Sequence, residues 1–185
     1  MSIVLASQSP RRKELLQMIV PEFLICPADI DESQLPGETP EQYVLRIARL
    51  KARKISQSDP QAIVIASDTI VTLEQTIYGK PATPAEARAT LQALSGRTHT
   101  VYTAVVLQQG NQIEEALVPT TVTFYPLTEV EISNYLMTKD YQDKAGSYGI
   151  QGPAAIFIQS IQGDYYSVMG LPLATVHRLL ANFKP

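Results

Sequence analysis

Two arginines stand at the start of a predicted helix, a position where cations are usually unfavourable. Ser9 is a suitable N-cap and Pro10 a suitable first residue, so Arg11 and Arg12 take the second and third positions. The positive end of the helix dipole disfavours a cation there by about 0.3–1 kcal/mol. A bound anion, such as a phosphate chain, would remove this conflict. The alternative is that both arginines are solvated, or that one pairs with Glu14.

Lys51 lies on the apolar face of another predicted helix, over residues 40–56. It follows Val44 by seven residues, and two helical turns bring both side chains to the same face. A lysine on a buried face usually extends its ammonium to water, and the spacing alone favours that interpretation. Otherwise the ammonium needs a carboxylate or a ligand phosphate.

Asp68 interrupts an apolar strand, between Ile63-Val64-Ile65-Ala66 and Ile70-Val71. Burying a lone carboxylate is costly, so Asp68 needs a lysine or a metal unless it only caps a turn at the strand end. Lys80 adds a cation in the loop Gly79-Lys80-Pro81, which lacks the remaining residues of a phosphate-binding P-loop. These charges indicate cations for phosphates and carboxylates for a divalent metal, the groups used in phosphoryl or nucleotidyl chemistry.

Alternating strand and helix patterns predict a mixed α/β fold with a partly antiparallel sheet. Gly110-Asn111 is the expected turn of a long hairpin. Thr39 and Gln42 form an expected capping box. The predicted strands are residues 3–6, 23–26, 63–71, 98–107, 113–125 and 156–161. The predicted helices begin at residue 10, span 40–56, 84 to about 95 and 129–136, and begin again near 172.

The composition is that of a folded protein, and we expect a single domain over residues 1–185. The net charge is −3 and there is no basic tract, which argues against stable nucleic-acid binding. No apolar run reaches about 18 residues, so we expect no membrane span, and the N-terminus does not match a signal peptide. Cys26, the one cysteine, is expected in the core and favours a cytoplasmic location. His99 and His177 lack metal-ligand spacing and are expected to be structural.

The same segments resemble the Maf family of nucleoside triphosphate pyrophosphatases. Each match is weak alone, but together they are specific, follow the family order and cover nearly the whole chain. They are LASQSPRRKELL (5–16), DE (31–32), ARLKA (48–52), SDTIV (67–71), GKP (79–81), LSG (94–96), KAGSYGIQG (144–152) and VMGLPL (168–173). The resemblance implies an elongated α/β fold shared with the inosine triphosphate pyrophosphatases, in which helices flank a mixed sheet and two lobes enclose a central cleft. It also leaves a homodimer as an expectation.

The resemblance further implies cleavage between the α- and β-phosphates with a divalent cation, Mg²⁺ or Mn²⁺. By this likeness, Lys51 and Lys80 would neutralise the triphosphate and the leaving pyrophosphate. Asp68 would act as general base, directly or through a metal-bound water, and Glu32 would help to hold the metal. The residues that would bind the phosphates are Ser7, Ser9, Arg11 and Arg12.

Three positions distinguish two branches of the resembling family. Arg11, Thr69 and Gln151 match the branch that acts on dTTP and UTP, whereas the branch that acts on 7-methyl-GTP tends to have an aromatic residue, Gln and Glu. A neutral amide can donate to and accept from a pyrimidine, and a carboxylate favours a cationic methylated guanine. We therefore expect action on dTTP and UTP, with modified pyrimidine triphosphates also open. A 7-methyl-GTP pyrophosphatase and a nucleotide-binding regulator of septum formation are the alternatives.

Overall fold

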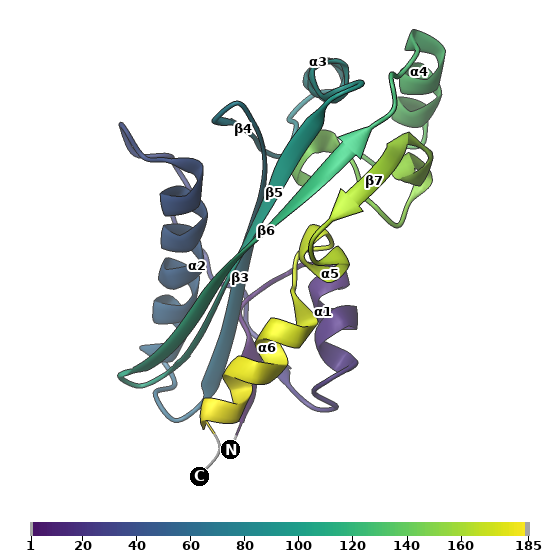
Figure 1. The fold of residues 1–185 in the computed structure, drawn as a ribbon. Helices are drawn as coiled ribbons and strands as arrows, with labels where there is room; N and C mark the ends of the chain where they lie inside the picture. The colour runs from purple at the N-terminus through teal and green to yellow at the C-terminus, as the bar shows by residue number, and fades with distance from the viewer. Residues whose placement is uncertain (1, 184–185) are drawn as a thin grey trace.

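Seven strands form one elongated mixed sheet in the computed structural model, which describes residues 2–183 (Figure 1). The strand order is β2-β1-β3-β5-β6-β7, and β4 pairs with β3 outside this path. β1 runs parallel to β2 and β3, and every other pairing is antiparallel. The strands are β1 (Ile3–Leu5), β2 (Leu24–Ile25), β3 (Ile63–Leu73), β4 (Thr76–Tyr78), β5 (Thr98–Gln109), β6 (Gln112–Phe124) and β7 (Ile158–Gln162).

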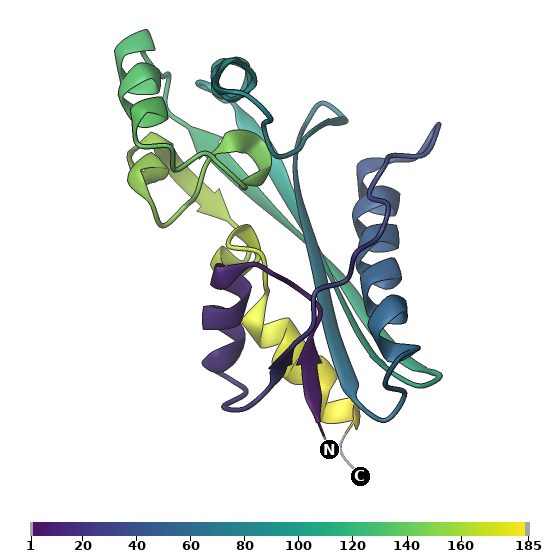
Figure 2. The ribbon, with the colours of Figure 1, turned by 180° about the vertical axis from the view of Figure 1, so that it is seen from behind.

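Helices cover both faces of the long strands. α2 lies on one face, and α1 with α6 lies on the other, as two opposite views show (Figures 1 and 2). The α-helices are α1 (Pro10–Gln17), α2 (Pro40–Ser56), α3 (Pro84–Leu94), α4 (Glu129–Met137), α5 (Tyr165–Val168) and α6 (Leu173–Leu180). The described residues also form the 3-10 turns η1 (Ala145–Ser147), η2 (Pro153–Phe157) and η3 (Ala181–Phe183).

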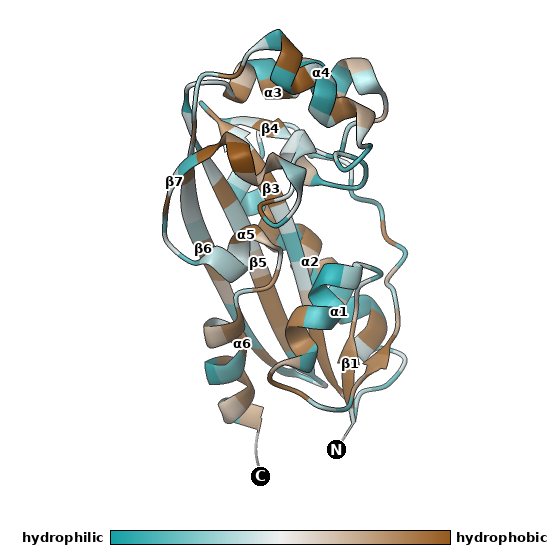
Figure 3. Cartoon of the chain, turned by 90° about the vertical axis from the view of Figure 1, so that its right-hand side faces the viewer, coloured by the Kyte–Doolittle hydropathy of each residue, from teal (hydrophilic) through white to brown (hydrophobic). Residues whose placement is uncertain are grey.

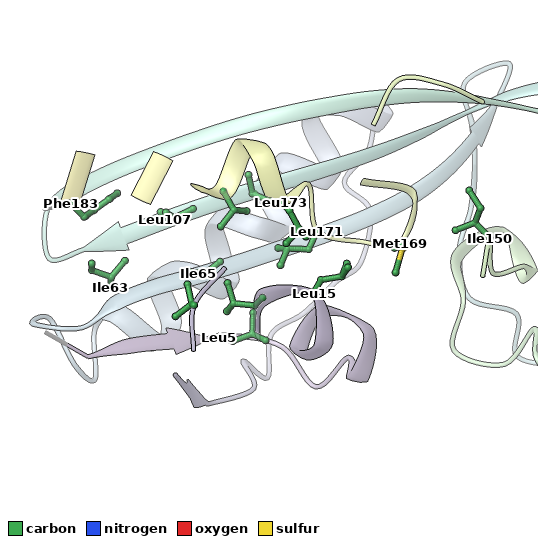
Figure 4. Close-up of a cluster of buried hydrophobic side chains, with 14 residues drawn as sticks. Leu5, Leu15, Ile63, Ile65, Leu107, Ile150, Met169, Leu171, Leu173 and Phe183 are labelled. Carbon is green, nitrogen blue, oxygen red and sulfur yellow. The ribbon is translucent and has the colours of Figure 1, made fainter. Parts of the chain in front are cut away.

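The alternation of side chains along β3 assigns its residues to the two faces. Val64 and Ala66 pack with α2, whereas Ile63 and Ile65 pack on the side of α1 and α6. Figure 4 shows this second cluster, in which Leu5 and Ile65 meet residues from α1 and the C-terminal segment. The long strands therefore carry a core on each face.

A further core lies at the other end of the sheet, under α3 and α4. Leu91 of α3, Ile132 of α4 and Phe124 at the end of β6 belong to it. Figure 3 shows α3 and α4 together at one end and α1 with α6 toward the other. The long strands join these two lobes, which confirms the predicted fold class. No helix within residues 2–183 combines the length and the apolarity needed to cross a bilayer.

Most expected elements are present, and the main differences are these. The predicted strand 156–161 begins only at Ile158, because η2 occupies Pro153–Phe157. β4 and the one-turn helix α5 were not predicted. The expectation that Cys26 lies in the core is wrong, since the side chain is exposed beyond the two-residue strand β2.

Candidate active site

A gap on one edge of β3 lies beside a cavity that several sequence-predicted residues line. On this edge β1 pairs as far as Ile65 and β4 pairs from Val71 onward, while β5 covers the opposite edge. The unpaired stretch contributes Asp68, Thr69 and Ile70 to a cavity of about 480 Å³. This volume lies within the ordinary range for small-molecule sites, about 300–1,000 Å³.

Side chains from both faces of β3 reach this cavity. By alternation, Asp68 points toward α2 and Thr69 toward α1. Accordingly, Asp68 contacts Lys51 from α2, and Thr69 contacts Arg12 from α1. The strand gap thus brings two helices, on opposite faces of the sheet, to one site.

Lys51 bridges two carboxylates. Its Nζ lies 2.8 Å from Asp68 Oδ1 and 2.8 Å from Glu32 Oε1. Lys51 is 8% exposed and Asp68 9%, so the expectation that Lys51 extends to water is wrong, and the carboxylate alternative holds. The Glu32 side chain, at 48%, remains accessible from solvent.

Glu32 belongs to an irregular segment between β2 and α2 that is fastened from α2. The Tyr43 hydroxyl donates to the main-chain oxygen of Glu32 at 2.9 Å. Arg46 donates to the main-chain oxygen of Ser33 at 2.9 Å and binds both carboxylate oxygens of Glu38, at 2.5 and 2.8 Å. Burial, with the nearby Asp68 and Glu32 charges, raises the pKa of Tyr43 to about 12, so it stays a donor. Sequence reasoning missed Tyr43 and Arg46.

Arg12 is held by three acceptors. Its Nε donates to Gly170 O at 2.8 Å, and its terminal nitrogens donate to Ser7 Oγ at 3.4 Å and Thr69 Oγ1 at 3.2 Å. Within residues 2–183, no carboxylate lies within 4 Å of this guanidinium. Burial lowers the pKa of Arg12, against the opposing charge of Asp68. A cation so placed favours an incoming anion.

Ser7 is the one sequence-predicted site residue that does not line the cavity. It is buried, and its hydroxyl accepts from Arg12 and from the Ser9 amide at 3.2 Å. Its position suits a support for Arg12, not a direct contact with a ligand. The sequence-predicted residues that do line the cavity are Ser9, Arg11, Arg12, Glu32, Lys51, Asp68, Thr69, Lys80 and Gln151.

Two further cations complete the charged wall. Arg11 and Lys80 line the cavity, and among the described residues neither has a carboxylate within 4 Å. Ser9 caps α1 by accepting from the Arg12 amide, so the amino end of this helix faces the site. A helix start beside cations is suited to binding phosphate oxygens.

The remaining lining, which we call the neutral wall, consists mainly of uncharged residues. It contains Gln151, Ile150 and Tyr148, together with Asp143 and the mutually neutralised pair of Asp140 and Lys144. Apolar side chains from the strands and from the segment before α6 complete this wall, namely Val71, Ile77, Val101, Val168 and Met169. The cavity lining therefore combines cations that suit phosphates with mainly uncharged residues that suit a neutral group.

Two carboxylates are candidates for holding a divalent metal. No group of three or more His, Cys, Asp or Glu residues capable of holding an ion occurs in the part of the chain that the structure describes. Mg²⁺ is commonly bound through one or two carboxylates, waters and substrate phosphates. Glu32 and Asp68, both near Lys51 on the cavity wall, match that kind of donor set.

Comparison with known proteins identifies relatives of this chain and a structure with the same fold. A protein that is 46% identical over 179 residues, covering 96% of this chain and 97% of its own, is the dTTP/UTP pyrophosphatase of Lacticaseibacillus casei. The Bacillus cytotoxicus protein of the same name is 47% identical over 180 residues, covering 97% and 94%. The Ham1 protein of Staphylococcus aureus aligns over 100% of both chains with a TM-score of 0.56 and 15% identity, which shows a shared fold. The Maf-like protein family model matches residues 2–183, and the chain belongs to the Maf family.

Proposed function

We propose that this protein is a dTTP/UTP pyrophosphatase, which hydrolyses these nucleotides to the monophosphate and pyrophosphate with Mg²⁺ or Mn²⁺. The names of the Lacticaseibacillus casei and Bacillus cytotoxicus relatives support this reaction. The observation that carries it is the convergence, in one cavity, of the Asp68–Lys51–Glu32 group with a wall of further cations.

The charged wall would bind the triphosphate. Arg11, Arg12 and Lys80 would contact its oxygens together with the amino end of α1, and Ser9 lies at that same end. Such fixed positive charge stabilises the additional negative charge of the transition state and the leaving pyrophosphate. Lys51, which also lines the cavity, would add a further positive charge.

Asp68 would act as the general base. Its Oδ1 is oriented by Lys51 at 2.8 Å, and the carboxylate would take the proton from the attacking water. A divalent cation, when held by Glu32 and Asp68, would neutralise phosphate charge and make the water more acidic. Tyr43 and Arg46 would serve this step indirectly, by holding the main-chain oxygens of Glu32 and of Ser33 next to it.

The neutral wall would receive the base. Gln151 presents an amide that can donate to and accept from uracil or thymine. Thr69 already bonds to Arg12 and to Thr103 at 2.9 Å, so its part in selectivity would run through the position of Arg12. Arg11, the third position that distinguishes the two branches of the family, also lines the cavity.

A panel of nucleotides at equal concentration tests the proposal. With Mg²⁺, dTTP and UTP should release pyrophosphate faster than CTP, GTP or 7-methyl-GTP. Gln151→Glu should lower the rate on dTTP and UTP and raise the relative rate on 7-methyl-GTP. A wild-type preference for 7-methyl-GTP would favour the sister activity, and nucleotide binding without turnover would favour a regulatory role.

Location and partners follow from the same proposal. We infer a cytoplasmic enzyme whose partner is a free nucleotide, since the chain has one cysteine, a net charge of −3 and no basic tract. The homodimer implied by family resemblance stays a prediction, and light scattering of the purified protein would check it.

A further inference from the structure

Lys144 is a cation on the cavity wall that is already neutralised. Its Nζ lies 3.0 Å from Asp140 Oδ1 and also donates to the main-chain oxygen of Asp140. Both side chains are largely covered, with exposed fractions of 14% and 23%. In this respect Lys144 differs from Lys80, which has no such partner in residues 2–183. The paired ammonium is therefore poorly suited to binding a phosphate.

Asp140 is also tied to α4. The buried hydroxyl of Tyr135 is 3.2 Å from Asp140 Oδ2 and 3.1 Å from the main-chain oxygen of Ser147. Burial and the adjacent Asp140 charge raise the pKa of Tyr135, so the phenol remains a donor. One carboxylate thus links α4, the Lys144 side chain and, through Tyr135, the turn η1.

The pair supports the turn that carries Gln151. The Gly152 amide donates to Gly149 O at 3.2 Å, which closes the turn with Gln151 in its third position. A Cβ placed on Gly149 would lie 2.7 Å from Lys144 Cε, and one on Gly152 would lie 2.7 Å from Asp140 Oδ2. Both glycines therefore lie directly against the ion pair, and a side chain at either position would displace it.

We infer that Asp140, Lys144 and Tyr135 form a positioning unit for base recognition. The unit fixes the height and angle of the turn from Gly149 to Gly152, and this places the Gln151 amide against the edge of the pyrimidine. The unit affects recognition of the base, whereas the phosphates are bound by the charged wall. The inference rests on the proposed function and assigns its base selectivity to residues that do not themselves touch the substrate.

The two halves of the substrate can be tested separately by calorimetry. Binding of UMP requires the neutral wall, which would receive the base. Binding of inorganic pyrophosphate with Mg²⁺ requires the charged wall alone. Tyr135→Phe and Asp140→Asn should each weaken UMP binding by about tenfold, the effect of losing one hydrogen bond to a charged group. They should also reduce the preference for UMP over GMP and leave pyrophosphate binding unchanged. Tyr135→Phe removes a single oxygen, so it tests the unit even if Asp140→Asn fails to fold.

The matched control is Glu129→Gln, which changes a carboxylate to an amide in an exposed ion pair with Arg88 at 2.8 Å in the same lobe. It should leave both affinities unchanged. The inference would be overturned by variants that lose affinity for UMP and for pyrophosphate equally, or by variants that keep the normal preference for UMP over GMP. It would also be overturned if Lys144→Met weakened pyrophosphate binding alone. A wild-type protein that binds no UMP and cleaves no UTP removes the proposed function as well. Normal UTP cleavage with unaltered selectivity in the variants removes the inference alone.

Discussion

Asp68 Oδ1 on β3 and Lys51 Nζ on α2, the helix that covers one face of the sheet, lie 2.8 Å apart. Burying such a pair gives little net stability compared with two apolar side chains of similar size. The pair is better explained by a role in catalysis than by a contribution to folding stability. Substitutions in the pair should therefore change stability and activity to different extents, and both can be measured.

Removing one member of this pair should destabilise the protein more than removing both. Lys51→Met alone should lower the free energy of unfolding by about 1–3 kcal/mol, because the covered Asp68 carboxylate loses its partner. Asp68→Leu alone should cost less, because Lys51 keeps its contact with Glu32. The double variant should regain most of that loss and remain inactive. Urea unfolding at neutral pH, with pyrophosphate release measured on the same samples, checks both parts. A double variant that shows the full sum of the two losses contradicts this account.

Arg12→Lys should raise the KM for UTP by about tenfold or more, because losing one hydrogen bond of a charged group costs about 1.5–3 kcal/mol. A single ammonium cannot meet Gly170 O, Ser7 Oγ and Thr69 Oγ1 in the geometry of the planar guanidinium. Steady-state kinetics with Arg53→Lys as control, an exposed change on α2, measures this. A KM equal to that of the wild type would show that Arg12 is not needed in this form.

Tyr43→Phe should raise the Mg²⁺ concentration needed for half-maximal activity about threefold to tenfold, the cost of one lost hydrogen bond. Its hydroxyl holds the main chain at Glu32, and a looser segment presents the carboxylate less often. The kcat at saturating Mg²⁺ should stay near that of the wild type. Tyr125→Phe, an exposed and distant change, is the control. In a Glu32→Gln background, Tyr43→Phe should not raise the required Mg²⁺ concentration further. An additive effect would show that Tyr43 does not act through Glu32.

His99 should make the protein sensitive to mild acid. It is 2% exposed, and burial lowers its pKa from 6.5 to about 4. The unfolded chain gains the proton first, so stability is intact above pH 6.5 and declines as the pH falls toward 4. The full loss is about 3 kcal/mol, at 1.36 kcal/mol per pKa unit. His99→Gln should flatten this decline in melting temperature, and an unchanged decline would mean that another group titrates.

The local patterns that set the elements were readable from the sequence. Thr39 and Gln42 do form the capping box of α2, which spans residues 40–56 as predicted. The apolar run around Asp68 did continue as one strand, β3. These features depend on neighbouring residues alone, so periodicity and capping chemistry were sufficient.

Contacts between segments that are distant in the sequence were not predicted. Spacing placed Lys51 on a buried face but could not show that Asp68 contacts it, so the prediction favoured water as its partner. The bond from Arg12 to Gly170 joins residues 158 positions apart, which no helical or strand pattern encodes. The pairing of Lys144 with Asp140 is local, four residues apart, and its role was missed because it depends on how Gly149 and Gly152 pack against the pair.

Quantitative phosphorus NMR of UTP incubated with Mg²⁺ and either wild-type protein or Asp68→Asn tests the central claim most directly. The wild type should form UMP and pyrophosphate in equal amounts, with no UDP. The Asp68→Asn protein should remain folded, because the amide oxygen can still accept from Lys51, and should be slower by about 10²–10⁴-fold, the usual contribution of a general base. Formation of UDP and orthophosphate, or an Asp68→Asn rate equal to that of the wild type, would contradict the account.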